Sequence, residues 1–360
     1  MEHVPPNWFA TVMGTGIVAV GAKLLPVSSP LLDAVALVFW LLAVAVLAGV
    51  GAAYVGHWVR HPDRARAHLS DPVVAHFHGA VPMALLTVGA GTLLVGSDVL
   101  GPGPALCIDW GLWLVGTLLG LATAVGVPYL AITRHAPTPA FGGWLMPVVP
   151  PMVSASTGAL LAPSLSGQAA TTLLAACAAL FGASLLAALC VIAAIWQRLA
   201  TQGVGAAAAV PTVWIVLGPL GQSITAANGL ANRVPDALRA SAVDAAVVFG
   251  LCVWGFALLW LALALGLTLR TARTDLPFSL TWWSFTFPLG TVVTGTSALA
   301  VHTELDVFRW TAVLLFTGLL ALWSLVAART VRGLATGAFR APRPAPSAVV
   351  RPRRELDYAI

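Results

Sequence analysis

Long runs of apolar residues alternate with short polar segments along almost the whole chain. A helix that crosses a bilayer needs about 20 consecutive apolar residues. The predicted spans are, in order, 8–27, 31–56, 72–96, 105–133, 140–162, 168–197, 210–231, 242–269, 280–301 and 308–330. The pattern predicts an all-α integral membrane protein with ten transmembrane helices. We expect a membrane domain over 1–332 and a disordered basic tail, rich in Pro and Arg, over 333–360.

The odd-numbered and even-numbered spans differ in composition. The odd spans hold most of the prolines and hydroxyl side chains, whereas the even spans hold one internal proline, Pro128. Interrupted helices are tolerated in hydrocarbon only where protein or a watery cavity receives the freed backbone groups. We therefore expect the odd spans to surround one axis and form a pore, with the even spans facing lipid. The predicted pore-lining residues are Thr11, Gly14, Thr15, Gly16, Pro82, Pro151, Pro219, Ser223, Phe285 and Pro288.

The odd spans recur at a regular spacing of about 70 residues, which is typical of repeated structural units. Each unit reads as one helical hairpin, made of an interrupted span followed by a smooth one. The alternative is that proline and glycine are simply enriched in membrane helices, where small residues allow close packing. The two interpretations differ in whether the odd helices converge on a common axis.

The charge content sets the class of protein. Only 9% of residues are Asp, Glu, Lys or Arg, whereas soluble domains carry about 25%, so a soluble enzyme is excluded. The formal charge of +5 lies mostly in the tail, and no nucleic-acid partner is predicted. All but four of the 18 lysines and arginines, namely Lys23, Arg233, Arg239 and Arg309, lie on the N-terminal side of the predicted topology. The positive-inside rule then places both termini in the cytoplasm, with the spans in the cell membrane.

Acidic residues are absent from the middle of every odd span. Asp33, Asp109, Asp244 and Asp306 fall near the outer ends of the even spans. There we expect them to cap free N–H groups and to meet the positive end of the helix dipole. The alternative role is a proton or cation relay. Because intramembrane acids usually mark cation pathways, the pattern argues against a cation or drug exporter.

Histidine is the side chain best suited to gain and lose a proton near neutral pH. His76 and His78 open the third span at its cytoplasmic side, where they predict an anion or proton site at the mouth of the pore. The alternative is an interfacial position, which we also expect for His57, His61, His68 and His302.

The ninth span opens with two tryptophans and two phenylalanines before a proline, over 282–288. Phe287 directly precedes Pro288, and an apolar ring in a narrow lumen would block ions by dewetting. Ordinary packing is the alternative role for this ring. The chain has no nucleotide-binding loop, no metalloprotease motif and no close cysteine pair. We therefore predict no catalytic residue, metal or cofactor. A membrane-embedded enzyme or scaffold without a conduit remains the competing class.

Two segments carry a resemblance to a known family. The stretch Asn7-Trp8-Phe9-Ala10-Thr11-Val12-Met13-Gly14-Thr15-Gly16-Ile17 resembles the opening motif of the tellurite-resistance/dicarboxylate transporter family. The segment 282–288 resembles the ninth-helix motif of the same family. This family includes a fungal malate permease, a yeast sulfite efflux pump and the slow anion channel of plant guard cells. The resemblance covers roughly residues 7–332 and leaves out the tail.

The resemblance implies a fold, an assembly and a gate. It implies five helical hairpins in quasi-fivefold arrangement around a central pore, and a homotrimer in which each subunit has its own pore. Phe287 matches the family's gating phenylalanine. The implied function is transport of small anions, with C4-dicarboxylates such as malate as the first expectation and sulfite or tellurite-related oxyanions as the alternative. The expected partners are the anionic substrate, the lipid bilayer and two further copies of the chain.

Overall fold

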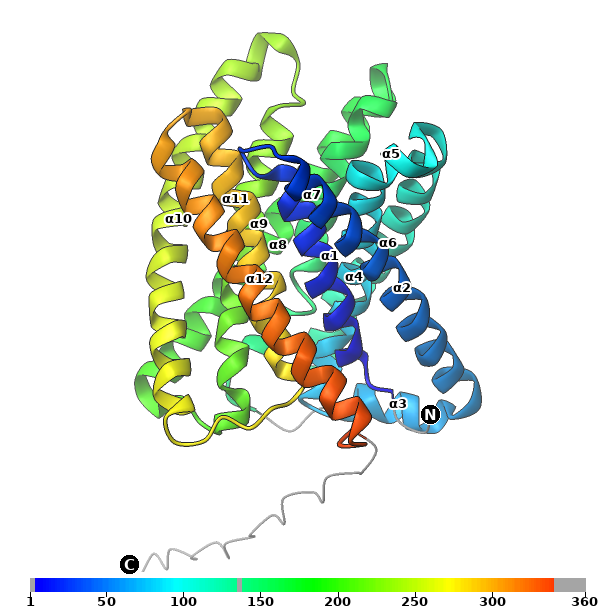
Figure 1. The fold of residues 1–360 in the computed structure, drawn as a ribbon, viewed down its shortest axis with the longest axis vertical. Helices are drawn as coiled ribbons and strands as arrows, with labels where there is room; N and C mark the ends of the chain where they lie inside the picture. The colour runs from blue at the N-terminus through cyan, green and yellow to red at the C-terminus, as the bar shows by residue number, and fades with distance from the viewer. Residues whose placement is uncertain (1–3, 135–137, 340–360) are drawn as a thin grey trace, which may run out of the picture.

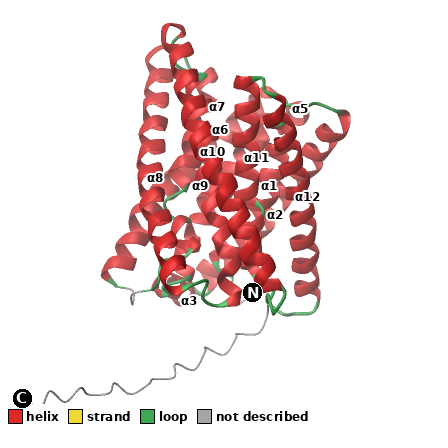
Figure 2. Cartoon of the chain, turned by 90° about the vertical axis from the view of Figure 1, so that its left-hand side faces the viewer, coloured by secondary structure: helices red, strands yellow, loops and turns green. Residues whose placement is uncertain are grey.

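The computed structural model describes residues 4–134 and 138–339; the tail beyond 339 lies outside this range. Within the described residues every regular element is a helix (Figure 2). The α-helices are α1 (Phe9–Leu24), α2 (Pro30–Arg60), α3 (Pro62–Ser70), α4 (Ala80–Gly91), α5 (Ser97–Leu100), α6 (Pro102–Thr133), α7 (Pro150–Leu161), α8 (Gly167–Gln202), α9 (Leu217–Ala231), α10 (Asp236–Ala272), α11 (Phe287–Thr303) and α12 (Asp306–Ala335). The last helix thus continues three residues beyond the predicted end of the membrane domain.

Short 3₁₀ segments precede five of these helices. They are η1 (Pro6–Trp8), η2 (Val74–Gly79), η4 (Gly142–Leu145), η6 (Ala207–Val216) and η7 (Leu280–Phe285), which lead into α1, α4, α7, α9 and α11. A further 3₁₀ turn, η5 (Ala162–Ser164), follows α7, and a π-helical turn, η3 (Thr92–Gly96), follows α4. Each predicted odd span is therefore a 3₁₀ segment joined to a shorter α-helix.

Burial separates the helices into two sets, which alternate along the chain as the odd-numbered and even-numbered spans were predicted to do. In α2, α6, α8, α10 and α12 only 17–22% of the most apolar window is buried, against 78–89% in the segments that contain α4, α9 and α11. Almost every residue of α1 and α7 is buried as well. Among the described residues, eight helical segments are long and apolar enough to cross a membrane. The other two predicted spans, which contain α1 and α7, remain predictions.

The five buried helices contact one another in a closed cycle. Helix α1 packs against α4, α4 against α7, α7 against α9, α9 against α11, and α11 against α1. The exposed helices lie outside this cycle: α2 packs on α1, α6 on α4, α8 on α7, α10 on α9 and α12 on α11. Figure 1 shows α2 and α10 on opposite flanks of the bundle. The core of the protein is therefore the cycle itself, which we name the inner ring.

The inner helices all begin at the same end of the bundle. Their five 3₁₀ segments contact one another in the same cyclic order as the helices that follow them. We name this the basal end. The opposite, distal end is where the inner helices terminate, at Leu24, Gly91, Leu161, Ala231 and Thr303. The last turns of α12 and the first turn of α1 lie together near the basal end (Figure 1).

The prolines of the odd spans mark helix starts, and this corrects the expectation that they interrupt helices midway. Pro150 is the first residue of α7 and Pro288 the second residue of α11. Pro82 and Pro219 are each the third residue of their helices, α4 and α9. Because N–H groups in the first turn have no partner within the helix, proline costs little there. The interruption is thus a 3₁₀-to-α junction on the basal side.

Two of the four acidic residues predicted to cap helices lie in first turns, at the positive end of the dipole, but Ser29 caps α2 and no side chain among the described residues caps α12. Asp33 and Asp306 fall in the first turns of α2 and α12. Asp244 and Asp109 do not cap, because α10 begins at Asp236 and α6 at Pro102, upstream of the apolar runs used for prediction. Asp244 is exposed, whereas Asp109 is fully buried, and neither of its carboxyl oxygens has a hydrogen-bond partner among the described residues.

Candidate functional site

A cavity of about 230 Å³ lies inside the distal half of the inner ring. All five inner helices contribute to its wall, and most of the lining residues come from α7, α9 and α11 and from the two residues after α9. Its polar lining residues are Thr87, Ser156, Thr157, Gln222, Thr225, Asn228, Asn232, Arg233, Thr294, Ser297 and His302. The cavity is therefore a shared product of the ring, built by segments that are far apart in the sequence.

The hydroxyl groups in the wall are already engaged with their own helices. The Thr157 hydroxyl donates to the carbonyl of Val153 at 2.9 Å, and the Thr294 hydroxyl donates to the carbonyl of Thr291 at 3.0 Å. The amide nitrogen of Gln222 donates to the hydroxyl oxygen of Ser156. A hydroxyl must turn away from its carbonyl before it can donate to an anion, which makes the wall a weak binder.

Stronger donors gather at the distal rim of the cavity. Asn228 and Asn232 lie one turn apart at the end of α9, and His302 lies near the end of α11. Nδ1 of His302 is 2.7 Å from Oδ1 of Asn228, and Nε2 is 2.9 Å from Oδ1 of Asn232. Arg233 follows directly and also lines the cavity. We name these four residues the distal rim.

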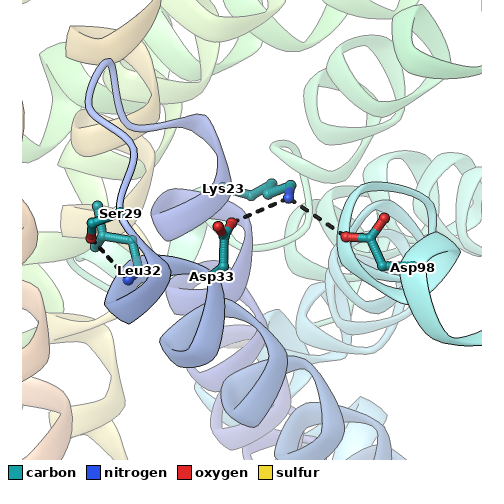
Figure 3. A network of polar contacts seen from close by, with 5 residues as sticks. All are labelled: Lys23, Ser29, Leu32, Asp33 and Asp98. Atoms are coloured by element: carbon teal, nitrogen blue, oxygen red, sulfur yellow. Dashed lines mark hydrogen bonds and ion pairs between the residues drawn. The ribbon is translucent and has the colours of Figure 1, made fainter.

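The cavity carries positive charge and no carboxylate. Among its described lining residues, Arg233 is the single member of the Asp, Glu, Lys and Arg group. Lys23 directly precedes Leu24, which lines the cavity. The amine of Lys23, however, pairs with Asp33 at 3.3 Å and Asp98 at 3.7 Å (Figure 3). The charge of Lys23 is thus compensated outside the cavity, whereas Arg233 makes no ion pair with any residue that the structure describes. Electrostatics therefore favour an anion in this space.

Phe287 separates this cavity from a second, smaller one. The second cavity measures about 30 Å³ on the basal side and is lined largely by apolar side chains, among them Met13, Met83 and Met146. Phe287 lines both cavities and is only 3% exposed. It is the first residue of α11, directly after the 3₁₀-to-α junction at Thr286. An apolar ring at this point divides a polar chamber from an apolar one.

The predicted pore-lining residues divide into two groups. Pro219 and Pro288 line the small cavity, next to Phe287. The others line neither cavity: Thr11, Gly14, Thr15, Gly16, Pro82, Pro151, Ser223 and Phe285.

Contacts within the wall explain the positions of this second group. An added Cβ on Gly14 would collide with Thr286, and one on Gly16 would press on Thr87. The two glycines thus allow α1 to approach its neighbours, as the packing alternative proposed. Thr15 accepts a hydrogen bond from the indole of Trp323 at 3.0 Å, and the Phe285 ring packs edge-on against Trp214.

The histidines are more buried than the sequence predicted. His76 and His78 lie within η2 at the basal end but line neither cavity. His76 stacks near Trp144, with ring centroids 6.0 Å apart, and His78 faces the carbonyl of Ala75 at 3.0 Å. His57 and His68, for which interfacial positions were expected, are both buried within the protein, with stacked rings 5.4 Å apart. Their interfacial position remains a prediction.

Sequence reasoning gave His302 only an interfacial position, whereas the structure shows that it also lines the large cavity. The sequence signal that would have identified His302 is the presence of polar residues at the ends of two neighbouring inner spans. The seventh span ends with two asparagines four residues apart followed by Arg233, and the ninth span ends with His302. Because both spans belong to the inner set and run in the same direction, their polar ends had to meet. Among the described residues, no cluster of His, Cys, Asp and Glu is arranged to hold a metal ion.

Comparison with known proteins decides the family. The family model described as voltage-dependent anion channel (SLAC1) matches residues 3–331. The chain belongs to this family. It is 30% identical to the sulfite efflux pump SSU1 of Trichophyton rubrum, over 92% of this chain and 91% of the pump. It is 29% identical to the pump of the same name from Arthroderma otae, with the same coverage, and 28% identical to an uncharacterized transporter of Methanocaldococcus jannaschii, over 94% of this chain and 95% of that protein.

Membership confirms the resemblance found in the sequence motifs. The protein is a multi-pass membrane protein of an anion transporter and channel family. The members compared are transporters or channels rather than enzymes, so the alternative of a membrane-embedded enzyme is set aside. A positively charged cavity inside a ring of buried helices fits this family assignment.

Proposed function

We propose that the protein passes small anions along the axis of the inner ring, from one side of the membrane to the other. The observation that carries this proposal is the large cavity, which five inner helices build together and which contains Arg233 but no acidic side chain among its described lining residues. Weakly binding hydroxyls suit passage, because an ion held tightly in a conduit does not leave. The wall of Thr and Ser residues provides such weak sites.

Phe287 is the proposed gate. Its ring lies between the two cavities, and the basal cavity is too small and too apolar to hold a hydrated ion. Transport then requires that the ring turn aside at the junction between η7 and α11. Within this proposal the basal histidines, His76 and His78, lie behind the closed gate as a secondary anion or proton site.

The first proposed substrate is sulfite. Two of the relatives described above are named sulfite efflux pumps and match over nine-tenths of this chain. A compact oxyanion needs only one cationic contact, which matches a cavity with a single charged lining residue, Arg233. Malate, the first expectation from the motifs, carries two carboxylates at its ends and would leave one of them against hydroxyls alone. Malate therefore becomes the competing substrate in the experiment.

The number of spans, their orientation in the membrane and the assembly of the protein are part of the same proposal. Ten spans form five hairpins around the pore in quasi-fivefold arrangement, with α1 and α7 completing the crossing through their 3₁₀ extensions. The basal end faces the cytoplasm, in accord with the distribution of lysine and arginine, and both termini lie on that side. The proposed assembly is a homotrimer in the cell membrane with one pore in each subunit.

Flux into proteoliposomes tests the function. Purified full-length protein is reconstituted, and the uptake of labelled sulfite, labelled malate and labelled sodium is followed with an imposed voltage. We expect sulfite uptake above that of empty vesicles, weaker malate uptake and no sodium uptake. Malate uptake that exceeds sulfite uptake would reverse the order of substrates. Sodium uptake equal to that of sulfite would refute anion transport.

A further inference from the structure

The distal rim combines features that an anion-binding site needs. His302 lies between two asparagine side chains, so its ring is held in one orientation at the entrance to the large cavity. Arg233 follows Asn232 in the chain, is exposed, and lines the same cavity. Nothing in the family assignment or in the names of the relatives assigns a role to these residues.

The hydrogen bond to Asn228 determines which ring nitrogen of His302 carries a hydrogen in the neutral state. The amide nitrogen of Asn228 donates to the carbonyl of Ile224 at 2.8 Å, which leaves its oxygen facing Nδ1 of the ring. A carbonyl oxygen only accepts hydrogen bonds, so Nδ1 must carry a hydrogen. On the other side, the Asn232 amide lies 2.9 Å from Nε2 and can meet this nitrogen through its oxygen or, after turning, through its NH₂ group.

Asn232 links the proton on His302 to the cavity. When the ring is neutral, Nε2 is an acceptor, and the amide of Asn232 must turn to present its NH₂ group to the ring. When the ring is protonated, Asn232 accepts with its oxygen and its NH₂ group is released. Because Asn232 also lines the cavity, protonation adds a positive ring and an amide donor to the same opening.

We propose that the distal rim, Asn228, Asn232, Arg233 and His302, is a binding site for a small oxyanion, and that it binds in the protonated state of His302. The proposal rests on the proposed function and names the place where an anion is collected before it enters the conduit. The imidazolium and the guanidinium hold the charge, and the Asn232 amide donates to an anion oxygen. Affinity is then highest at low pH and falls as the pH rises through the titration range of histidine.

The charge that lines the cavity at this site is positive, although the surrounding elements carry more acidic than basic groups near the distal end. The acidic groups near the distal end are largely engaged: Asp306 pairs with Arg309 at 2.9 Å, and Asp236 pairs with Arg239 at 2.6 Å. Beyond these, the charged groups on the surrounding elements nearest the distal end are Arg233 at the end of α9, Asp244 on α10, Lys23 at the end of α1 with its partners Asp33 and Asp98, and Glu304 just after α11. Arg270 on α10 and Arg329 and Arg332 on α12 lie toward the other ends of their helices. Of these, Arg233 is the one that lines the cavity with His302.

Nitrate is the test probe, because it keeps a single negative charge across the pH range used. The thermal unfolding of the full-length protein in detergent is followed against nitrate concentration at pH 5.5 and at pH 8, with gluconate at equal ionic strength as reference. A ligand that binds only the folded state stabilises it by RT ln(1 + c/Kd), where c is the free ligand concentration, so the rise of the unfolding temperature with nitrate concentration reports the Kd. We expect native protein to bind nitrate about fivefold more tightly at the lower pH, which is the size of effect that one nearby charge produces near a protein surface.

Variants separate binding from a merely structural tie between α9 and α11. His302→Gln should show the weaker nitrate affinity at both pH values, and Arg233→Gln should bind weakly at both while keeping some pH dependence. The matched controls, His61→Gln and Arg239→Gln, lie outside the cavity and should behave as native. If His302→Gln does not fold, the nitrate affinities of native protein and of Asn232→Ala, each compared at the two pH values, still test the proposed site.

Two outcomes would overturn the site. Native protein that binds nitrate equally at both pH values contradicts it, as does a His302→Gln variant that keeps the pH dependence. The parallel flux assay distinguishes this failure from failure of the proposed function. Flux without pH-dependent nitrate binding removes the rim site alone, whereas pH-dependent binding without flux supports the site and refutes transport.

Discussion

The two ends of the inner ring differ in shape and in chemistry, although the same five helices build both. The distal end encloses about 230 Å³ lined by hydroxyls, amides and Arg233, whereas the basal end leaves about 30 Å³ lined largely by apolar side chains. At the basal end the five 3₁₀ segments contact one another in the same cyclic order as the inner helices. Under the proposed function, this difference assigns the control of access to the basal end and the binding of anions to the distal end.

Removing the ring of Phe287 gives the largest expected effect, because it removes the boundary between the two ends. In Phe287→Ala the cavities join, and we expect anion flux to rise by about tenfold or more, which corresponds to lowering a barrier by about 1.4 kcal/mol. The measurement is anion current across planar bilayers.

The matched control for this variant is Phe285→Ala, two residues earlier. Phe285 is equally buried but packs on Trp214 and lines neither cavity, so its removal should lower stability and leave the current at the native level. An increase of similar size in both variants would show that general loosening, rather than a gate, opens the path.

The crossing of α9 and α11 lies between the two ends and provides the second prediction. A Cβ on Gly221 would collide with the backbone of Thr291 and Val292. Because the colliding atoms belong to backbone, Gly221→Ala should lower the free energy of unfolding by about 1–3 kcal/mol. Gly255→Ala is the control, since an added Cβ there meets nothing within 4 Å. Equal thermal stability of the two variants would mean that the helices do not cross this closely.

The third prediction concerns the back of the distal wall. Asp109 on α6 is buried against Gly89 of α4, and its carboxyl oxygens have no recorded hydrogen-bond partner. Replacing an unsatisfied buried polar group with an apolar one of similar size usually stabilises, so Asp109→Leu should raise stability by about 1–3 kcal/mol. Thermal unfolding measures this. Loss of flux in a variant that is equally or more stable would instead give the acid a part in transport.

The smallest effect is expected at Lys23, which lies at the distal end but outside the cavity. Its ion pairs with Asp33 and Asp98 are partly exposed (Figure 3). Such pairs contribute less than about 1 kcal/mol, so Lys23→Met should change thermal stability little and leave nitrate affinity unchanged. A fall in nitrate affinity as large as that of Arg233→Gln would show that Lys23, although ion-paired outside the cavity, also contributes to the electrostatic potential at the distal rim.

Much of the architecture was predictable because the surroundings of a membrane helix determine the composition of the whole span. Smooth Leu, Ala and Val runs predicted the exposed helices, and clustered prolines and hydroxyls predicted the buried ones. The helix starts were less predictable, because proline and acidic residues extend α6 and α10 beyond their apolar runs, which is why Asp109 and Asp244 were misplaced.

The candidate site was predictable only in part. Phe287 was found through its position before Pro288 and through the family motif, and it lies between the two cavities. The distal rim was missed because His302 and Asn232 stand at span ends, where polar residues are ordinary. Their significance comes from hydrogen bonds between segments 70 and 74 residues apart in the chain, which composition does not record.

One measurement tests the central claim that anions travel through the large cavity. Ala298 lines this cavity and is partly exposed, so Ala298→Cys in the Phe287→Ala background presents a thiol inside the proposed path. A negatively charged, membrane-impermeant thiol reagent is applied while anion current is recorded, with the Phe287→Ala parent, which keeps the native cysteines, as control. We predict a large loss of current in the cysteine variant and none in the parent. Complete modification of the thiol with unchanged current would contradict the account, because the ions would then cross the membrane elsewhere.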